Sequence, residues 1–197
     1  MDVRTVAVIG AGTMGAGIAQ VCAQTGWQTR LYDAFPDGLH KGMDSIHAFW
    51  DKGIARGKTT EQQKSEWSTN LSSHEDIFEA VSGADLVIEA VPEVMELKQS
   101  IFRQLEEMAP SHAILATNTS GLQIGEIASA TGCPERVIGM HFFNPVPLMS
   151  LLELVRHESC SDETVESAQS IGSAMGKETI LVGDVPGFAT SRLGVVL

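Results

Sequence analysis

Cysteine and positive charge are both scarce in this sequence, and each scarcity excludes a class of protein. The three cysteines, Cys22, Cys133 and Cys160, are widely spaced and form no Cys-x-x-Cys pair. The sequence therefore predicts neither a disulfide framework nor a metal site, and reduced, mostly buried thiols are expected. Thirteen Lys and Arg residues stand against 25 Asp and Glu residues, a formal net charge of -12. This balance argues against a nucleic-acid partner, because phosphate backbones require a basic face.

Long apolar runs are also missing. No uninterrupted stretch approaches the roughly 20 apolar residues of a membrane-spanning helix. The first predicted strand begins almost at once, which leaves no room for a signal peptide. We therefore expect no membrane partner and a cytoplasmic location. The 197 residues, 43% hydrophobic and 19% charged, suffice for one well-buried domain.

The strongest positive signal is a glycine-rich turn near the start of the chain. The apolar run 6–9 is typical of a strand buried on both faces, and a Gly-x-Gly-x-x-Gly pattern follows it. In such a pattern the first glycine permits a tight turn, the second lets the backbone approach a pyrophosphate, and the third lets a helix pack closely. The helix N-terminus then attracts the phosphates. The predicted cofactor-binding residues of this turn are Gly10, Gly12, Thr13, Met14 and Gly15.

An acidic residue indicates which dinucleotide would bind. A second apolar strand at 29–32 ends in Asp33. A carboxylate at this place accepts hydrogen bonds from the adenosine ribose hydroxyls and repels a 2′-phosphate. The sequence therefore predicts NAD rather than NADP. The alternative is a glycine-rich turn that binds nothing.

Strands and helices alternate along the rest of the chain. Further strands are predicted at 70–73, 84–91, 113–117, 137–143, 151–155 and 178–182, and helices at 74–81, 94–108, 122–130 and 162–175. This alternation predicts an α/β fold with a doubly wound, mostly parallel, Rossmann-like sheet. Apolar residues at helical spacing predict an inserted helical pair at 39–67. The basic residues within this pair include Lys41, Lys52, Arg56 and Lys58.

Three polar residues, Ser120, His141 and Glu153, belong to segments at strand ends on the side where open α/β sheets bind ligands. Oxidation of a secondary alcohol by a nicotinamide cofactor needs a base for the hydroxyl proton, and an imidazole has a suitable pKa. We expect His141 to be this base, Glu153 to hold its ring, and Ser120 to contact the substrate oxygen.

Each of these residues also has a purely structural interpretation. His141 could be a satisfied histidine at a strand end, Glu153 a solvent-facing strand residue, and Ser120 a cap of the next helix. The remaining histidines have no matching partner in the sequence, and we expect them on the surface: His40, His47, His74, His112 and His157.

Five segments together resemble the (S)-3-hydroxyacyl-CoA dehydrogenase family, which includes 3-hydroxybutyryl-CoA dehydrogenases. They are Gly-Ala-Gly-Thr-Met-Gly-Ala-Gly-Ile-Ala-Gln at 10–20, Glu-Ala-Val-Pro-Glu at 89–93, Asn-Thr-Ser at 118–120, His-Phe-Phe-Asn-Pro-Val-Pro at 141–147 and Asp-Val-Pro-Gly-Phe at 184–188. They occur in order over essentially the whole chain. The resemblance implies an NAD-dependent oxidoreductase of fatty acid metabolism, acting in β-oxidation. Its reaction interconverts (S)-3-hydroxyacyl-CoA and 3-ketoacyl-CoA.

The resemblance also implies roles for single residues. His141 matches the catalytic histidine, Glu153 its acidic partner, and Ser120 a serine that contacts the substrate. The basic residues of the helical pair become candidate partners for the phosphates of CoA. Positions near the nicotinamide half of the cofactor are matched by Glu93, Lys98 and Asn118, and Asn144 matches an asparagine beside the catalytic histidine, close to cofactor and substrate.

Two departures from the family are visible. Ser191 stands where the family has an asparagine that touches the substrate, and the helical C-terminal domain that forms the family's homodimer is absent from this chain. The resemblance thus implies an NAD-binding domain at 1–184 and the start of a truncated helical domain at 185–197, with weak activity for the fragment. Two alternatives stay open: a dehydrogenase of a free 3-hydroxy acid, and a non-catalytic NAD-binding module.

Overall fold

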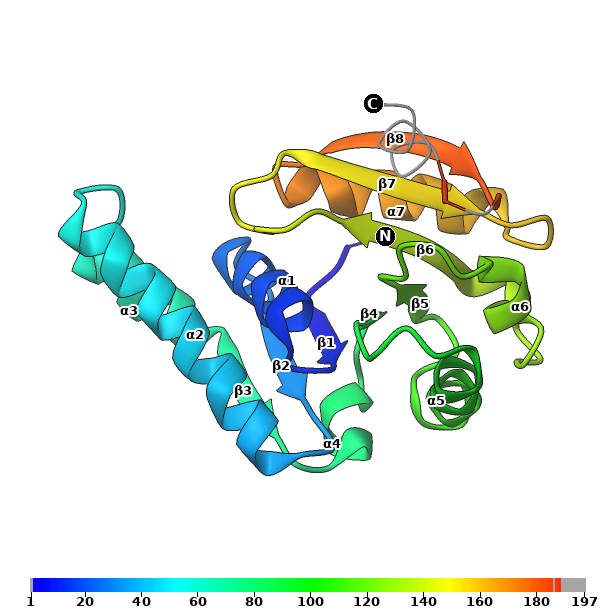
Figure 1. Cartoon of the computed structure of the whole chain (residues 1–197), viewed down its shortest axis with the longest axis horizontal. Helices are drawn as coiled ribbons and strands as arrows, with labels where there is room; N and C mark the ends of the chain where they lie inside the picture. Colours follow the sequence, from blue (N-terminus) through cyan, green and yellow to red (C-terminus); the bar gives the residue numbers. More distant parts are fainter. Residues whose placement is uncertain (1, 186, 189–197) are drawn as a thin grey trace.

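The computed structural model describes residues 2–185, 187 and 188, and in this part of the chain eight strands form one sheet (Figure 1). The strand order is β3-β2-β1-β4-β5-β6-β7-β8. The strands are β1 (Thr5–Ile9), β2 (Gln28–Tyr32), β3 (Leu71–His74), β4 (Leu86–Glu89), β5 (Ile114–Thr117), β6 (Val137–Phe142), β7 (Leu151–Arg156) and β8 (Glu178–Gly183). The helices are α1 (Thr13–Gln24), α2 (Pro36–Ala55), α3 (Glu61–Thr69), α4 (Ile77–Val81), α5 (Met95–Met108), α6 (Ile124–Ala128) and α7 (Asp162–Ala174), with a 3₁₀ turn, η1, at Pro134–Arg136.

Helices cover both faces of the sheet. Neighbouring strand residues alternate between two apolar cores: Val8 and Ile88 pack with α1, α2 and α7, whereas Ala7 and Val87 pack with α4, α5 and α6. This alternation is what a pleated strand buried on both faces requires. The predicted doubly wound α/β fold is confirmed.

All strand pairs are parallel except one. β6 and β7 run antiparallel, and their register places His141 directly opposite Glu153. The other six pairings are parallel, so the prediction of a mostly parallel sheet is confirmed. The antiparallel pair brings two predicted site residues together through main-chain hydrogen bonding.

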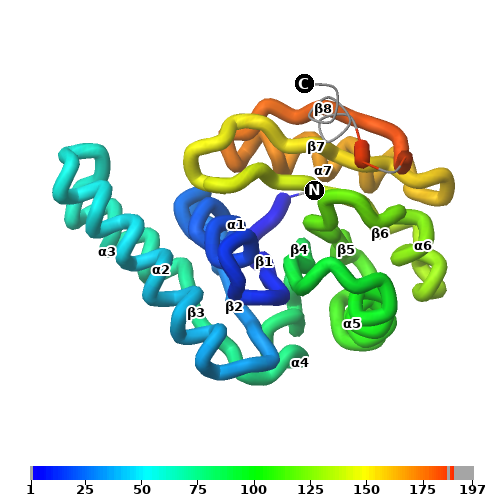
Figure 2. The backbone as a smooth tube through the Cα atoms, in the orientation of Figure 1, coloured from blue at the N-terminus to red at the C-terminus, as the bar shows by residue number. Residues whose placement is uncertain are grey.

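The inserted helical pair is confirmed as α2 and α3, which extend side by side away from the sheet (Figures 1 and 2). α2 continues through Gly53 and ends at Ala55. α3 begins with a capping box, in which the Thr60 hydroxyl accepts a hydrogen bond from the Gln63 amide while the Gln63 side chain accepts one from the Thr60 amide. Trp50 of α2 packs on Trp67 of α3, so the two helices form one unit.

The prediction of a surface position is wrong for His157. This histidine is 5% exposed, and its Nε2 lies 3.1 Å from the Pro134 carbonyl oxygen and 3.0 Å from that of Val137. The loop after β7 folds against the start of β6, where these two carbonyls satisfy the ring. The partners of His157 lie about 20 residues earlier in the chain, so the local sequence around His157 does not indicate this packing.

The cysteine expectation agrees with the structure: Cys22 and Cys160 are buried, and the three thiols are free. Burial raises the pKa of the Cys22 thiol to about 12 and that of Cys160 to about 11, so both thiols are protonated at neutral pH. No group of metal-ligating side chains occurs within the described residues. Over the same part of the chain, no helix combines the length and hydrophobicity needed to cross a bilayer.

Asp85 holds the start of β1 against β4, at the end of the strands opposite the glycine turn. Its Oδ2 accepts hydrogen bonds from the backbone amides of Arg4 at 2.8 Å and Thr5 at 3.0 Å, and its Oδ1 lies 3.1 Å from His112 Nε2. Burial by itself raises the pKa of Asp85, but the amide hydrogen bonds and His112 outweigh it, so the pKa is lowered.

Replacement of Asp85 by asparagine is therefore expected to lower the free energy of unfolding by about 1 kcal/mol at neutral pH, because the amide bonds lose their charged acceptor. The lowered pKa means that the carboxylate stabilises the fold fully above about pH 4 and that this stabilisation is lost as the pH falls through the folded-state pKa. Urea unfolding across this pH range checks it. Asp2→Asn, at an exposed ion pair with Arg4, serves as the matched control with no such difference.

Candidate active site

The glycine turn after β1 is shaped by close backbone contacts. Gly10 has φ = 103° and a side-chain carbon there would lie 2.7 Å from the Ala90 carbonyl oxygen, while one at Gly15 would overlap the Gly10 carbonyl. A side-chain carbon at Gly12, by contrast, would meet nothing within 4 Å. Gly10 and Gly15 are thus required by packing within the chain, and Gly12 leaves space open to a ligand.

A cavity of about 610 Å³ lies over this turn, and Gly12, Met14 and Asp33 are among the residues that line it. Asp33 Oδ2 accepts a hydrogen bond from the Ala11 amide at 2.7 Å, and its Oδ1 accepts one from the Phe35 amide at 2.9 Å. These bonds fix the carboxylate at the end of β2, beside the turn. The cavity lies where the strand order reverses between β2 and β4 around β1, the point at which open α/β sheets bind ligands.

A second cavity, of about 350 Å³, adjoins the first. The two share Met14, Ala90 and Val91 as lining residues. The further residues of the smaller cavity are Glu93, Asn118, Ser120, His141, Phe142, Phe143 and Asn144. Five of these lining residues were predicted from the sequence, and they follow or lie at the ends of β4, β5 and β6.

His141 and Glu153 form a buried pair in this region. His141 Nδ1 lies 2.7 Å from Glu153 Oε2, and the two residues are 7% and 0% exposed. The alternative interpretation of Glu153 as a solvent-facing strand residue is excluded. The histidine ring also packs on the rings of Phe143, at 4.5 Å between centroids, and Phe188, at 5.8 Å. The imidazole is therefore held on several sides, with Nε2 as the nitrogen left for chemistry in the cavity.

Asn118 connects two strands at the smaller cavity. Its Oδ1 accepts a hydrogen bond from the Phe142 backbone amide at 2.9 Å, and the backbone amide of Asn118 donates to the Glu89 carbonyl. Asn118 thus fixes the end of β5 against the end of β6, one residue from His141.

Glu93 holds the turn that carries Ser120. Its Oε1 accepts hydrogen bonds from the Thr119 hydroxyl and from the amides of Ser120 at 3.0 Å and Gly121 at 3.2 Å. Ser120 does not cap α6, because the residue before that helix is Gln123 and its side chain makes no capping bond. Thr119 accepts instead from the Leu122 amide. The hydroxyl of Ser120, which lines the smaller cavity, also donates a long hydrogen bond of 3.4 Å to Glu93 Oε1.

Lys98 is buried, although a lysine in the first turn of a helix is usually solvated. Its side chain is 1% exposed, and its Nζ lies 2.6 Å from Oε1 of Glu89, which is fully buried. Glu89 Oε2 accepts a hydrogen bond from Thr117 at 2.7 Å. Sequence reasoning missed Glu89 as a site residue, although a carboxylate that ends an apolar strand, Leu-Val-Ile-Glu, was an available signal.

The remaining predicted residues differ in where they lie relative to the two cavities. Asn144 lines the smaller cavity but is exposed, and Ser191 lies outside the described residues. Four basic residues of the helical pair are exposed and line neither cavity: Lys41, Lys52, Arg56 and Lys58.

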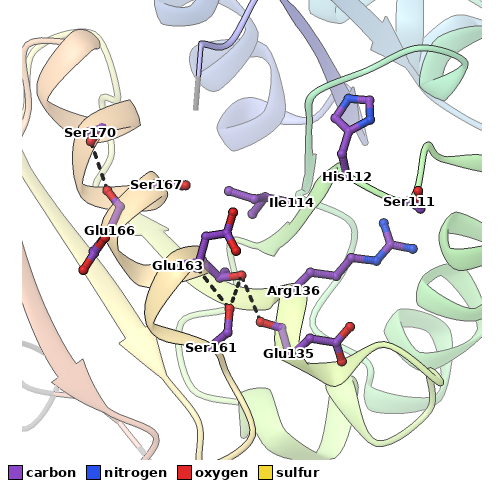
Figure 3. A pocket seen from close by; sticks show the side chains of 11 residues that line it. Ser111, His112, Ile114, Glu135, Arg136, Ser161, Glu163, Glu166, Ser167 and Ser170 are labelled. Carbon is purple, nitrogen blue, oxygen red and sulfur yellow. Dashed lines mark hydrogen bonds between the residues drawn. The ribbon is translucent and has the colours of Figure 1, made fainter.

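A third cavity, of about 480 Å³, lies at the opposite ends of the strands (Figure 3). It is lined by Ile114, the first residue of β5, whereas Asn118 of the smaller cavity follows the last residue of that strand. Figure 3 shows Arg136 beside Ser111 and His112, with side chains of α7 on the far side. Arg136 Nη1 donates to the carbonyls of Pro110 and Ala113. None of the predicted site residues lines this cavity.

The geometry agrees with comparisons to known proteins. The family described as "3-hydroxyacyl-CoA dehydrogenase, NAD binding domain" matches residues 5–185. Over 193 residues the chain is 40% identical to a probable 3-hydroxybutyryl-CoA dehydrogenase of Bacillus subtilis and 42% identical to a 3-hydroxyadipyl-CoA dehydrogenase of Escherichia coli. Both alignments cover 98% of this chain, but 67% and 40% of those proteins.

Solved structures give the same result. A 3-hydroxybutyryl-CoA dehydrogenase from Escherichia coli K12 matches with a TM-score of 0.95 at 42% identity, covering 98% of this chain and 41% of that one. The (S)-3-hydroxybutyryl-CoA dehydrogenase of Ralstonia eutropha matches with a TM-score of 0.94 at 36% identity, covering 98% and 68%. The chain thus spans between about two fifths and two thirds of the length of these relatives.

Proposed function

This chain belongs to the NAD-binding domain family of the 3-hydroxyacyl-CoA dehydrogenases, and we propose that it supplies the cofactor site and the proton-transfer pair for interconversion of (S)-3-hydroxyacyl-CoA and 3-ketoacyl-CoA. The cofactor of the family is NAD. The observation that supports the proposal most strongly is the buried His141–Glu153 pair, 2.7 Å apart, beside a cavity that adjoins the glycine turn.

The residues present fit the cofactor. Gly12 has open space where a side chain would stand, beside the free amides of the α1 N-terminus, which suits a pyrophosphate. Asp33 is fixed at the end of the larger cavity, where it would accept hydrogen bonds from ribose hydroxyls. The nicotinamide half would then reach the smaller cavity, near Glu93 and Asn118. When bound, NAD supplies the hydride acceptor.

The proton follows a separate path through the protein. In the oxidative direction His141 Nε2 accepts the proton of the 3-hydroxyl group, while Glu153 holds the Nδ1 proton and stabilises the imidazolium. In the reductive direction the same imidazolium returns the proton to the carbonyl oxygen. The Ser120 hydroxyl would hydrogen-bond that oxygen and orient it.

We also propose that the substrate is an acyl-CoA thioester. The exposed basic residues of α2 and the turn after it are candidates for the CoA phosphates, and Asn144 and Ser191 for substrate contacts. We further propose that residues 1–184 act as the NAD-binding domain in β-oxidation in the cytoplasm, and that a helical C-terminal domain starting at 185–197 provides the homodimer. The fragment alone would then turn over slowly, because half of the acyl cleft would be missing.

The test is NADH oxidation with two matched acceptors, acetoacetyl-CoA and free acetoacetate. Slow turnover that depends on the CoA thioester and is inhibited by free CoA supports the proposal. Equal rates with both acceptors would favour a dehydrogenase of a free 3-hydroxy acid. NADH binding without turnover of either acceptor would favour a non-catalytic NAD-binding module.

Glu153→Gln is expected to lower kcat by about 10- to 100-fold, because the neutral amide stabilises the imidazolium less than a carboxylate does. KM for acetoacetyl-CoA is expected to stay nearly unchanged, since Glu153 is buried behind the histidine. Steady-state kinetics separates the two parameters. A variant with wild-type kcat would show that the pair has only a structural role.

A further inference from the structure

Three linked charges lie beneath the smaller cavity. Glu89 and Lys98 are buried and form an ion pair with a distance of 2.6 Å between Oε1 and Nζ. Lys98 Nζ also lies 3.4 Å from Oε2 of Glu93, whose side chain is 41% exposed and lines the cavity. We refer to Glu89, Lys98 and Glu93 as the charge triad.

The charge triad is closed by further hydrogen bonds. Glu89 accepts from the Val91 amide at 2.7 Å and from the Thr117 hydroxyl at 2.7 Å, and Lys98 donates to the Val91 carbonyl at 3.2 Å. Both carboxylate oxygens of Glu89 and the ammonium group of Lys98 therefore have hydrogen-bond partners. Such an ion pair is a weak source of net stability, because desolvation offsets its attraction. The charge triad lies next to the smaller cavity, so its charge can act on a ligand bound there.

The net charge of the charge triad is negative. Glu89 and Lys98 compensate each other, and Glu93 adds one further carboxylate. Burial of Glu93 opposes its ionisation, but the Thr119 hydrogen bond and the positive charge of Lys98 outweigh it and lower its pKa. Glu93 is therefore ionised at neutral pH, and one uncompensated negative charge faces the cavity.

The two redox forms of the cofactor differ in the charge of the nicotinamide ring. The oxidised ring carries a positive charge and the reduced ring is neutral. A fixed negative charge in the cavity wall stabilises the oxidised ring by Coulomb attraction and has little effect on the reduced one.

We propose that the charge triad sets the relative affinity of the site for oxidised and reduced NAD, with Glu89 as the buried residue that neutralises Lys98. The inference rests on the proposed placement of the nicotinamide half in the smaller cavity. Without the Glu89 charge, Lys98 would cancel Glu93, and the preference for the positive ring would be lost.

The experiment measures the Kd of NAD+ and of NADH by isothermal titration for wild type and Glu89→Gln. A glutamine has the same shape, accepts from Lys98 and donates to the Thr117 oxygen, so the fold is retained. We expect the ratio Kd(NAD+)/Kd(NADH) to rise about tenfold, the order given by two unit charges roughly 12 Å apart at an effective dielectric constant of about 20. No turnover is needed for this measurement.

Two further variants separate charge from structure. Glu93→Gln also adds one positive charge unit to the triad, so the ratio is expected to rise about threefold, less than for Glu89 because the more exposed site is screened. Thr117→Val is the matched control, because it removes a hydrogen bond to Glu89 without changing charge. It should weaken both forms equally and leave the ratio unchanged.

The outcomes are distinguishable. A wild-type chain that binds neither form contradicts the proposed function itself. A chain that binds both forms, with an unchanged ratio in Glu93→Gln and in Glu89→Gln, overturns only the role of the charge triad. If Glu89→Gln does not fold, the ratio in Glu93→Gln decides alone.

Discussion

His141→Gln is expected to lower the rate of NADH oxidation by acetoacetyl-CoA by about 10²- to 10⁴-fold, the range typical of a lost general acid–base group. Glutamine can occupy the site and hydrogen-bond Glu153, but it cannot accept and return a proton near neutral pH. Because His141 is buried against Phe143 and Phe188, its replacement leaves the glycine turn intact. The Kd of NADH is therefore expected to stay near the wild-type value.

The measurement is kcat/KM with acetoacetyl-CoA, paired with NADH titration of the same preparation. Loss of turnover with retained NADH binding assigns the proton-transfer role to His141. A variant that binds NADH and keeps more than about a tenth of the wild-type rate would contradict that role. His112→Gln, at the opposite edge of the sheet, is the matched histidine control and should retain turnover.

Gly15→Ala and Gly12→Ala are expected to fail in different ways. A methyl group at Gly15 overlaps the carbonyl oxygen of Gly10, and neither backbone segment can move without separating α1 from β1. We expect a loss of at least about 3 kcal/mol in the free energy of unfolding, at the upper end of overpacking effects. Urea or thermal unfolding measures this directly.

Gly12→Ala is the complementary change, since its methyl group meets no protein atom within 4 Å. Its stability should stay within about 1 kcal/mol of wild type, the loss expected where alanine replaces a glycine N-cap. Its affinity for NAD should fall at least about tenfold, because the methyl group obstructs the pyrophosphate. Equal loss of stability in both variants, or unchanged affinity in Gly12→Ala, would contradict the assigned roles of the two glycines.

The fold could be predicted because its signals are local. Apolar β-branched strands, helical periodicity in 39–67 and the glycine pattern at 10–15 each determine structure within a short stretch of chain. The order of the strands and the two helical layers then follow from the usual rules for βαβ units. α2 continues through Gly53 because its apolar residues pack on α1 and α3. This packing outweighs the low helix propensity of glycine.

The candidate site was predictable only in part, because its contacts join distant residues. The pairing of His141 with Glu153 was expected from their chemistry, but its geometry depends on the antiparallel register of β6 and β7, which no local pattern encodes. Lys98 reads as a surface lysine on a helical first turn, yet it reaches a carboxylate nine positions earlier. His157 likewise finds two carbonyls across a loop. Charge and burial at these positions are properties of the tertiary structure.

We propose that this chain joins a dinucleotide site to a His141–Glu153 proton-transfer pair. Single-turnover oxidation of NADH bound to the chain, after mixing with acetoacetyl-CoA, tests it most directly because one hydride transfer does not require fast product release. We expect complete oxidation of the bound NADH in wild type and a rate lower by about 10²-fold or more in His141→Gln. Oxidation at equal rates in both, or bound NADH that never reacts in wild type, would contradict it.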